Sequence, residues 1–371
     1  MANILKTSIL SSQGDILSSL RSIKSTTSKK STKKISAIEG DVDIPYFAFE
    51  KHIEDREDEI YLAIKEIVLQ TIVDLSADDK KETAIIVGTS IIDLNMIETI
   101  ENTMYDYKRT SYASQKRSID SYAKDLSDEL HLNGFTLSIN TACTSSANAI
   151  LEASNLVNLG IYKYVIVIGL EIFSKMMSSG FYSMQLLADS EIKPFDTQRD
   201  GTVLGEAIAC LLIGNDTNSW KIKGGFSNCD SMNITTVSEG GDEYVGVMQK
   251  ALLQTGLKTE DITALKAHAT GTPSNDFSEM NAISKVFERD IVFTALKPYI
   301  GHTIGACGAL EIALFMACID DGFIPKTINH KKSINPEYQP LVQNKKSTKG
   351  IFMFNFFGFG GNNTSLILEK E

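Results

Sequence analysis

One cysteine and two histidines occupy similar places in this sequence. Cys143 lies in "LSINTACTSSANAI" (137–150), between an apolar run and a small-residue segment with helical spacing. His268 and His302 also follow apolar runs and precede segments typical of helix starts. A thiol at a helix N-terminus meets unpaired N–H groups and the positive end of the helix dipole, which favour the thiolate. The pattern predicts a Cys-His-His site for nucleophilic chemistry, with a thiol of lowered pKa.

The other cysteines and histidines predict no second site. The cysteines show no CxxC pair and no regular spacing, so neither a disulfide framework nor a metal site is expected. Four of the five cysteines have apolar or small neighbours, as buried structural cysteines do. The five are Cys143, Cys210, Cys229, Cys307 and Cys318. The remaining histidines, which have polar or charged neighbours, are His52, His131 and His330.

Strand-like and helix-like segments alternate along the chain and must position these three residues. The expected strands cover 83–90, 136–141, 164–169, 207–213, 264–268, 291–295, 351–355 and 364–369. The expected helices cover 58–75, 277–287 and 305–320, with weaker helical stretches in 101–133. We expect an exposed polar loop over 24–34 and a linker or turn over 214–219. This alternation predicts an α/β fold whose sheets are covered by helices.

Composition narrows the class of protein. The chain has 371 residues, 43% of them hydrophobic, which is enough to bury a large core. A net charge of −11 argues against nucleic acid as a partner. The longest apolar runs are the length of strands, too short to span a membrane. The N-terminus lacks the basic start and long apolar region of a signal peptide, so a cytoplasmic location is expected.

Five motifs, in one order, resemble those of the elongating β-ketoacyl-acyl carrier protein synthases, the ketosynthases of the thiolase superfamily. Together they extend over roughly residues 136–371, and the match is poor before residue 80. They are "TACTSSA" around Cys143, "KPFDTQRDGTVLGEAIA" (193–209), "HATGTPSNDFSE" (268–279), "KPYIGHTIGACGALE" (297–311) and "FFGFGGNNTSLIL" (356–368).

The resemblance implies a fold and an activity. The fold would be the thiolase fold, two similar βα halves in a five-layered α/β/α/β/α body, with residues 1–214 carrying the nucleophile and 215–371 carrying both histidines. The activity would be that of an acyltransferase, a 3-oxoacyl-[acyl-carrier-protein] synthase in fatty acid or polyketide biosynthesis. No cofactor or metal would be bound, because the phosphopantetheine belongs to the partner acyl carrier protein. The chain would form a homodimer, or a heterodimer with a second ketosynthase-like subunit.

The resemblance also implies individual roles. Cys143 would accept the acyl chain, and His268 and His302 would promote malonyl decarboxylation and stabilise the enolate. The residues implied to support them are Lys297 and Glu311 as a charged pair, Phe359 as a gating aromatic with an oxyanion-hole N–H, Thr270 and Thr272 at the pantetheine arm, Phe181 at the acyl pocket, and Asp276 and Glu279 as acids that could instead serve a helix start.

Alternatives and departures remain open. A thiolase would have a second catalytic cysteine in the C-terminal glycine loop, and an initiating synthase would have asparagine in place of His302. A chain-length-factor-like subunit, which condenses nothing, usually lacks the cysteine. Ala269 replaces the usual glycine after the first histidine, and Asn362 follows the glycine loop where the family commonly has threonine. A specialised pathway, such as aryl polyene or other type II polyketide synthesis, therefore stands beside primary fatty acid synthesis.

The acidic chain must bind a carrier protein that is itself acidic in this family. Basic residues gathered at the docking site would offset the repulsion. Three clusters are candidates: Lys29, Lys30, Lys33 and Lys34; Lys331 and Lys332; and Lys345, Lys346 and Lys349.

Overall fold

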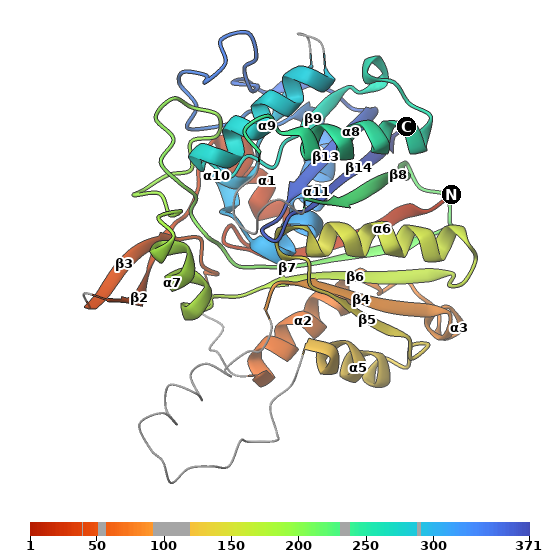
Figure 1. The fold of residues 1–371 in the computed structure, drawn as a ribbon. Helices are drawn as coiled ribbons and strands as arrows, with labels where there is room; N and C mark the ends of the chain where they lie inside the picture. The colour runs from red at the N-terminus through yellow and green to blue at the C-terminus, as the bar shows by residue number, and fades with distance from the viewer. Residues whose placement is uncertain (39, 51–56, 92–118, 231–237, 288–290) are drawn as a thin grey trace.

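A computed structural model describes the whole chain except residues 39, 51–56, 92–118, 231–237 and 288–290. Its central feature is a set of ten strands that form two five-stranded units (Figure 1). The units meet where β1 (Asn3–Ser11) lies beside β8 (Trp220–Cys229), through the single residue pair Asn3–Lys221. Each unit can therefore be described as a sheet of its own.

The two sheets have the same topology. The strand order of the N-terminal sheet is β5 (Thr136–Ile139), β4 (Thr83–Thr89), β6 (Tyr164–Glu171), β7 (Ala207–Gly214) and β1. The order of the C-terminal sheet is β10 (Phe293–Thr294), β9 (Ala264–Lys266), β13 (Gly350–Phe357), β14 (Asn362–Lys370) and β8. In both, the first three strands are parallel and the last two antiparallel to their neighbours. The halves are thus a structural duplication, which direct inspection of the sequence did not reveal.

Helices cover both faces of both sheets (Figure 1). The outer helices of the N-terminal sheet are α2 (Glu57–Thr71) and α5 (Ile119–Glu129), and those of the C-terminal sheet are α8 (Asp242–Thr255) and α9 (Pro273–Val286). Between the sheets lie α6 (Ser145–Asn158) and α11 (Cys307–Asp320). The expected five-layered α/β/α/β/α arrangement is confirmed.

Small residues allow the middle layer to pack closely. A Cβ on Gly308 of α11 would lie 2.3 Å from the backbone nitrogen of Ala147 on α6. A Cβ on Gly88 of β4 would lie 2.5 Å from the backbone of Ser146. Every residue of α11 from Cys307 to Phe315 is buried, as expected for a helix that is apolar all round. The start of each middle helix is therefore held firmly against its neighbours.

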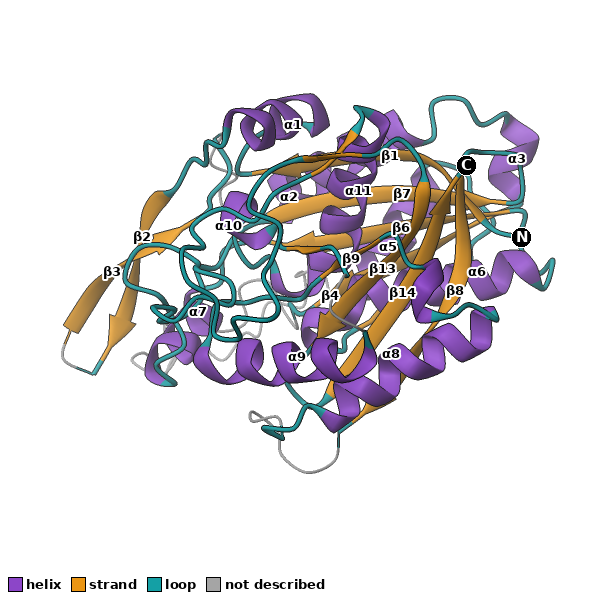
Figure 2. Cartoon of the chain, turned by 90° about the horizontal axis from the view of Figure 1, so that it is seen from above, coloured by secondary structure: helices purple, strands orange, loops and turns teal. Residues whose placement is uncertain are grey.

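Smaller elements complete the part of the chain that the structure describes. The hairpin of β2 (Ser31–Ala37) and β3 (Gly40–Tyr46) projects from the body in both views (Figures 1 and 2). The others are α1 (Ile16–Ser25), α3 (Ala77–Lys81), α7 (Lys175–Ser183), α10 (Lys297–Ile300), β11 (Phe323–Ile324), β12 (Lys345–Lys346) and three 3-10 turns, η1 (Ala142–Thr144), η2 (Thr259–Asp261) and η3 (Ile304–Ala306).

Each expected strand exists, with changed ends, but several expectations need correction. The helix predicted over 58–75 ends at Thr71, and α9 starts at Pro273, before the predicted 277. The segment 24–34 is not one loop, because α1 reaches Ser25 and β2 begins at Ser31. Of 101–133, residues 101–118 lie outside the described residues. In the described part of the chain, none of the helices has the length and apolar character needed to cross a bilayer.

Candidate active site

Cys143 lies in η1, in the short connection from β5 to α6. Its side chain is only 4% exposed. The preceding residue, Ala142, has φ 53°, a left-handed conformation that is costly for a residue with a Cβ. Ser145 supports this turn, since its hydroxyl accepts from Thr141 N at 2.9 Å and donates to Ala142 O at 2.7 Å. Such strain at a helix start is typical of a site where a side chain must point in one direction.

His302 occupies the matching connection of the C-terminal half, between α10 and α11. Its backbone N–H donates to Val203 O at 2.8 Å, and its carbonyl accepts from Gly205 N at 3.1 Å. The turn η3 that follows begins at Ile304, with φ 36°. Backbone bonds on both sides therefore fix the direction of the His302 side chain.

His268 follows β9, and its loop is held by a buried carboxylate. Glu279 of α9 accepts from the backbone N–H groups of His268 and Ala269, each at 2.7 Å. Ala269 has φ 50°, which explains why the family usually places glycine there and what strain the alanine brings. Asp276 holds the same loop by accepting from Gly271 N at 3.1 Å and Phe195 N at 2.7 Å. Both acids thus act on backbone N–H groups.

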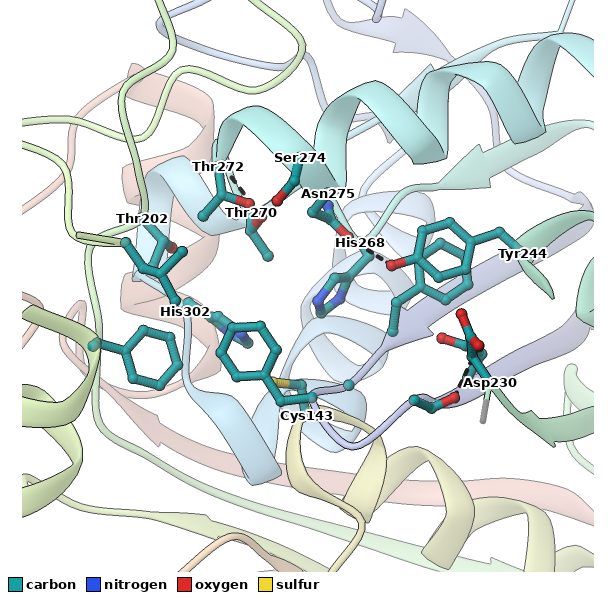
Figure 3. Close-up of a pocket in the computed structure, with 17 residues that line it drawn as sticks. Cys143, Thr202, Asp230, Tyr244, His268, Thr270, Thr272, Ser274, Asn275 and His302 are labelled. Carbon is teal, nitrogen blue, oxygen red and sulfur yellow. Dashed lines mark hydrogen bonds between the residues drawn. The ribbon is translucent and has the colours of Figure 1, made fainter. Parts of the chain in front are cut away.

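The three chemical side chains meet in one place (Figure 3). Cys143 Sγ and a ring nitrogen of each of His268 and His302 all lie within 4.8 Å of one another. The two imidazoles are nearly perpendicular, with ring centroids 5.4 Å apart. All three line a cavity of about 650 Å³, its open mouth included. The structure therefore brings together the cluster that the sequence motifs indicated.

Burial controls the charges at this cluster. Burial raises the pKa of the Cys143 thiol to about 12, although Lys297 and the backbone N–H groups of Phe359 and Cys143 oppose the rise. The predicted thiolate is thus wrong for the resting site, because loss of solvent outweighs the helix start. Burial, and then nearby Lys297, holds the pKa of both His268 and His302 well below the ordinary value. At neutral pH the site holds a thiol and two neutral imidazoles.

The predicted charged pair is present, and it has a third member. Lys297 donates to Glu311 Oε1 at 2.7 Å, and its Nζ lies 3.4 Å from His268 Nδ1. Lys266 donates to the other oxygen of Glu311 at 2.6 Å. All three ionic side chains are fully buried. The sequence motifs did not include Lys266, because it lies in a strand just before the motif that begins at His268. A lone lysine in an apolar run was nevertheless a usable signal.

Two aromatic rings close one side of the cavity. The rings of Phe181 on α7 and Phe359 in the glycine loop lie with centroids 5.5 Å apart. Gly358 packs against the backbone of the Cys143 turn, since a Cβ there would lie 3.0 Å from Thr141 O and 3.3 Å from Cys143 N. Asn362 ties this loop to the start of α6 by accepting from Thr144 Oγ1 at 2.5 Å. The asparagine that departs from the family pattern thus has a structural role.

Hydroxyl groups line the mouth of the same cavity. Thr270 and Thr272 share a hydrogen bond of 2.8 Å between their hydroxyls, and both face the cavity (Figure 3). Thr202 lines it as well, and its buried hydroxyl has no hydrogen-bond partner among the described residues. Sequence inspection missed Thr202, and also Tyr244 and Asp230, because single residues far apart in the chain give no signal before the fold places them together.

The cluster is better suited to covalent chemistry than to a cation. Three groups that can bind metals lie close together, but the ammonium groups of Lys297 and Lys266 stand behind them and would repel a cation. The expectation that the site uses no metal stays a prediction.

Comparison with known proteins identifies the family. The profile described as "Beta-ketoacyl synthase, N-terminal domain" matches residues 15–218, and "Beta-ketoacyl synthase, C-terminal domain" matches 220–331. The chain belongs to the β-ketoacyl synthase family. This confirms the resemblance stated above and the expected class of enzyme, an acyltransferase.

Relatives support this assignment. A 3-oxoacyl-[acyl-carrier-protein] synthase 2 of Rhizobium meliloti is 30% identical over 80% of this chain and 76% of its own length. The chloroplastic synthase I of Arabidopsis thaliana is 29% identical over 78% of this chain, and the match spans 66% of that relative.

Two solved structures show the fold. The ketosynthase ApeO in complex with its chain length factor ApeC from Xenorhabdus doucetiae has a TM-score of 0.86 at 24% identity, covering 100% of this chain and 98% of that one. The ishigamide ketosynthase/chain length factor gives a TM-score of 0.86 at 20% identity, covering 100% and 99%. The thiolase fold is thereby confirmed.

Proposed function

We propose that this β-ketoacyl synthase catalyses a decarboxylative Claisen condensation. It would join an acyl group from one acyl carrier protein to malonyl thioester on another, extending fatty acid or polyketide/aryl polyene chains by two carbons. The observation that carries the proposal is the meeting of Cys143, His268 and His302 within 4.8 Å at the base of one cavity.

The first step loads the enzyme. The Cys143 sulfur attacks the acyl thioester carbonyl and forms a new thioester, while the carrier's phosphopantetheine leaves as its thiol. Because burial keeps Cys143 protonated at neutral pH, its proton must leave as the bond forms. A neutral imidazole of the cluster is the base within reach and returns the proton to the leaving sulfur. The N–H groups of Phe359 and Cys143 would stabilise the oxyanion.

The second step makes the carbon–carbon bond. The malonyl C–COO⁻ bond breaks, carbon dioxide leaves, and the electron pair forms an enolate. Neutral His268 and His302 can donate N–H bonds to the oxygen on which that charge develops. The enolate carbon attacks the acyl carbonyl, the Cys143–acyl bond breaks, and the thiolate that leaves takes up a proton from solvent, because the reaction consumes one proton in each cycle. The low pKa of both imidazoles keeps them neutral at neutral pH, so that a base for the loading step is present in every cycle.

We also propose that the chain binds a carrier protein and pairs with a partner subunit. Thr270 and Thr272 offer hydroxyls at the mouth to a phosphopantetheine arm that the carrier brings, and Phe181 borders the acyl pocket. β5 is the edge strand of its sheet and is half-buried, which favours pairing with another subunit, a second copy or a ketosynthase-like partner. The neighbouring Ile91 is buried. The cytoplasmic location stays a prediction, since one relative above is chloroplastic.

The test is condensation by the purified chain, alone and with candidate partner subunits. Mass spectrometry should find a product two carbons longer from acyl- and malonyl-carrier protein. Glutamate reversal of the basic cluster that docks the carrier should slow turnover with carrier substrates and leave a short pantetheine thioester unaffected. Equal rates with coenzyme A thioesters would replace the carrier protein with a free-thioester substrate. Light scattering that shows an active monomer would refute the dimer.

The alternative, a chain-length-factor-like subunit, makes a different prediction. Such a subunit would support condensation by its partner equally well after Cys143→Ala. Its complete Cys-His-His cluster would then have no use, which is why we favour the condensing enzyme.

A further inference from the structure

Lys266 is a fully buried lysine that the condensation described above does not use. It is the last residue of β9, two residues before His268. Its ammonium donates to Glu311 Oε2 at 2.6 Å and to the carbonyl of Asn355 at 2.9 Å, and it lies 3.7 Å from the centroid of the Phe356 ring. Burial, and then Lys297, lowers the pKa of Lys266, but these contacts, Glu311 above all, favour the charged ammonium and oppose that fall.

Glu311 is therefore shared between two lysines. Lys297 binds Oε1 at 2.7 Å and Lys266 binds Oε2 at 2.6 Å. Two ammonium groups and one carboxylate leave a formal charge of +1 in a place without solvent. A simple Lys–Glu pair would leave none.

Other titratable groups face this cluster from every side. His268 and His302 lie on the cavity side, with Cys143 beyond them, and Cys307 lies on α11. Glu279 approaches from α9, but burial raises its pKa to about 7, and both its oxygens face the backbone N–H groups of the His268 loop. Glu279 is thus a poor counter-ion for the extra lysine.

We propose that Lys266 is a positioning residue that acts through Glu311 to keep an uncompensated positive charge behind both catalytic histidines. This charge holds the imidazoles neutral and ready to donate, and it stabilises the negative enolate oxygen. The inference rests on the proposed function, because it assigns Lys266 to the decarboxylation step.

The direction of the histidine titrations agrees with this geometry. After burial, Lys297 lowers the pKa of both His268 and His302, and Lys266 lowers both as well. An imidazolium at either histidine would lie close to the unbalanced ammonium. Because like charges repel, the neutral imidazole is favoured. If Lys266 only fastened α11 to β9 and β13, the pKa of the two histidines would not depend on its charge.

The test measures histidine protonation directly, by NMR titration of protein with labelled histidine. Lys266→Met removes the charge and retains an unbranched chain. We expect the midpoints of the two buried histidines to rise by about one pH unit. The acid limb of the pH–rate profile for malonyl decarboxylation should shift to higher pH with them. The rate of decarboxylation should fall about tenfold. The matched control Lys223→Met, which breaks the Lys223–Glu369 pair on β8 and β14, should change neither midpoint.

A second variant separates charge from structure. In Lys266→Met/Glu311→Gln, Lys297 alone restores the formal charge of +1. The histidine midpoints should return toward the wild-type values, even if stability is lost. Unchanged midpoints in the single variant, or a double variant with the same midpoints as the single, would overturn the proposal. If Lys266→Met does not fold, Lys266→Arg must retain the wild-type midpoints, and a rise there would also overturn it.

The two proposals can fail separately. Wild-type protein that neither decarboxylates nor condenses would refute the proposed function, whereas the histidine midpoints report on Lys266 without any turnover.

Discussion

The two halves of the molecule share a strand order and differ in what they contribute to the site. In the N-terminal half, the connection from β5 to α6 presents Cys143. In the C-terminal half, the connection from β10 to α11 presents His302. Both connections contain a 3-10 turn whose first residue, Ala142 or Ile304, has a positive φ. The same backbone device therefore presents the proposed nucleophile in one half and a proposed hydrogen-bond donor in the other.

Charge distinguishes the halves further. The fifth residue of α11 is Glu311, bound by two lysines, whereas the fifth residue of α6 is Ala149. The half proposed to stabilise the enolate thus has a buried ionic network, and the half with the thiol surrounds it with small residues. The duplicated scaffold thus fixes where the side chains point in both halves. The residue type at each position then decides which step of the proposed reaction each half would serve.

Removing the nucleophile should have the largest effect. We expect Cys143→Ala to abolish condensation, because it removes the thiol that is proposed to hold the acyl chain. Malonyl decarboxylation should persist in part, since it belongs to the C-terminal half. Product mass and carbon dioxide release measure the two reactions. Loss of both together, in a folded protein, would mean that the duties are not divided between the halves.

Removing either histidine should impair the C-terminal contribution. His268→Ala or His302→Ala should slow decarboxylation by roughly 10²–10³-fold, the cost of losing one oxyanion donor. The control is His131→Asn at an exposed loop position with φ 57°, which asparagine tolerates. Wild-type decarboxylation in both alanine variants would refute the assignment.

The glycine loop, residues 358–361, packs against the Cys143 turn of the N-terminal half. Two adjacent glycines test how closely this loop must pack. A Cβ at Gly361 would lie 2.0 Å from Asp230 O, whereas one at Gly360 meets nothing within 4 Å, and both residues have φ 81°. We expect Gly361→Ala to lower condensation by about tenfold or more, because the loop that holds Phe359 must move. Gly360→Ala should bring only the left-handed strain of about 1 kcal/mol. Equal effects of the two changes would show that the close approach to Asp230 is unimportant.

The last prediction concerns stability, not activity, in the N-terminal half. Glu171, which accepts from Ser90 Oγ at 2.7 Å, forms no salt bridge with a lysine among the described residues, and burial raises its pKa from 4.5 to about 7. Between these pH values the folded state retains a proton that the unfolded state has lost, so stability falls as pH rises. The unfolding free energy of wild type relative to Glu171→Gln should fall by about 3 kcal/mol from pH 4.5 to 7.5. Denaturant titrations that give parallel pH curves would contradict this.

Sequence inspection predicted the strands of both sheets that are continuous apolar runs, and it predicted the Cys-His-His cluster through its motifs. It missed β1 and β8, whose partly polar faces look unlike buried strands, and the hairpin of β2 and β3, whose lysines resemble a loop. It gave the wrong direction for the Cys143 pKa, because a local helix start is visible in sequence and the depth of burial is not. Lys266 escaped notice because its partner, Glu311, lies 45 residues away.

The central claim is that Cys143 receives the acyl chain before condensation. It is tested most directly by incubating the protein with acyl-carrier protein alone and locating the acyl adduct by peptide mass spectrometry. We predict one adduct, on the peptide that contains Cys143, and none on the exposed Cys229 or the buried Cys307, which donates to Cys143 O at 3.0 Å. An adduct on another cysteine, or condensation without an adduct on Cys143, would contradict the claim.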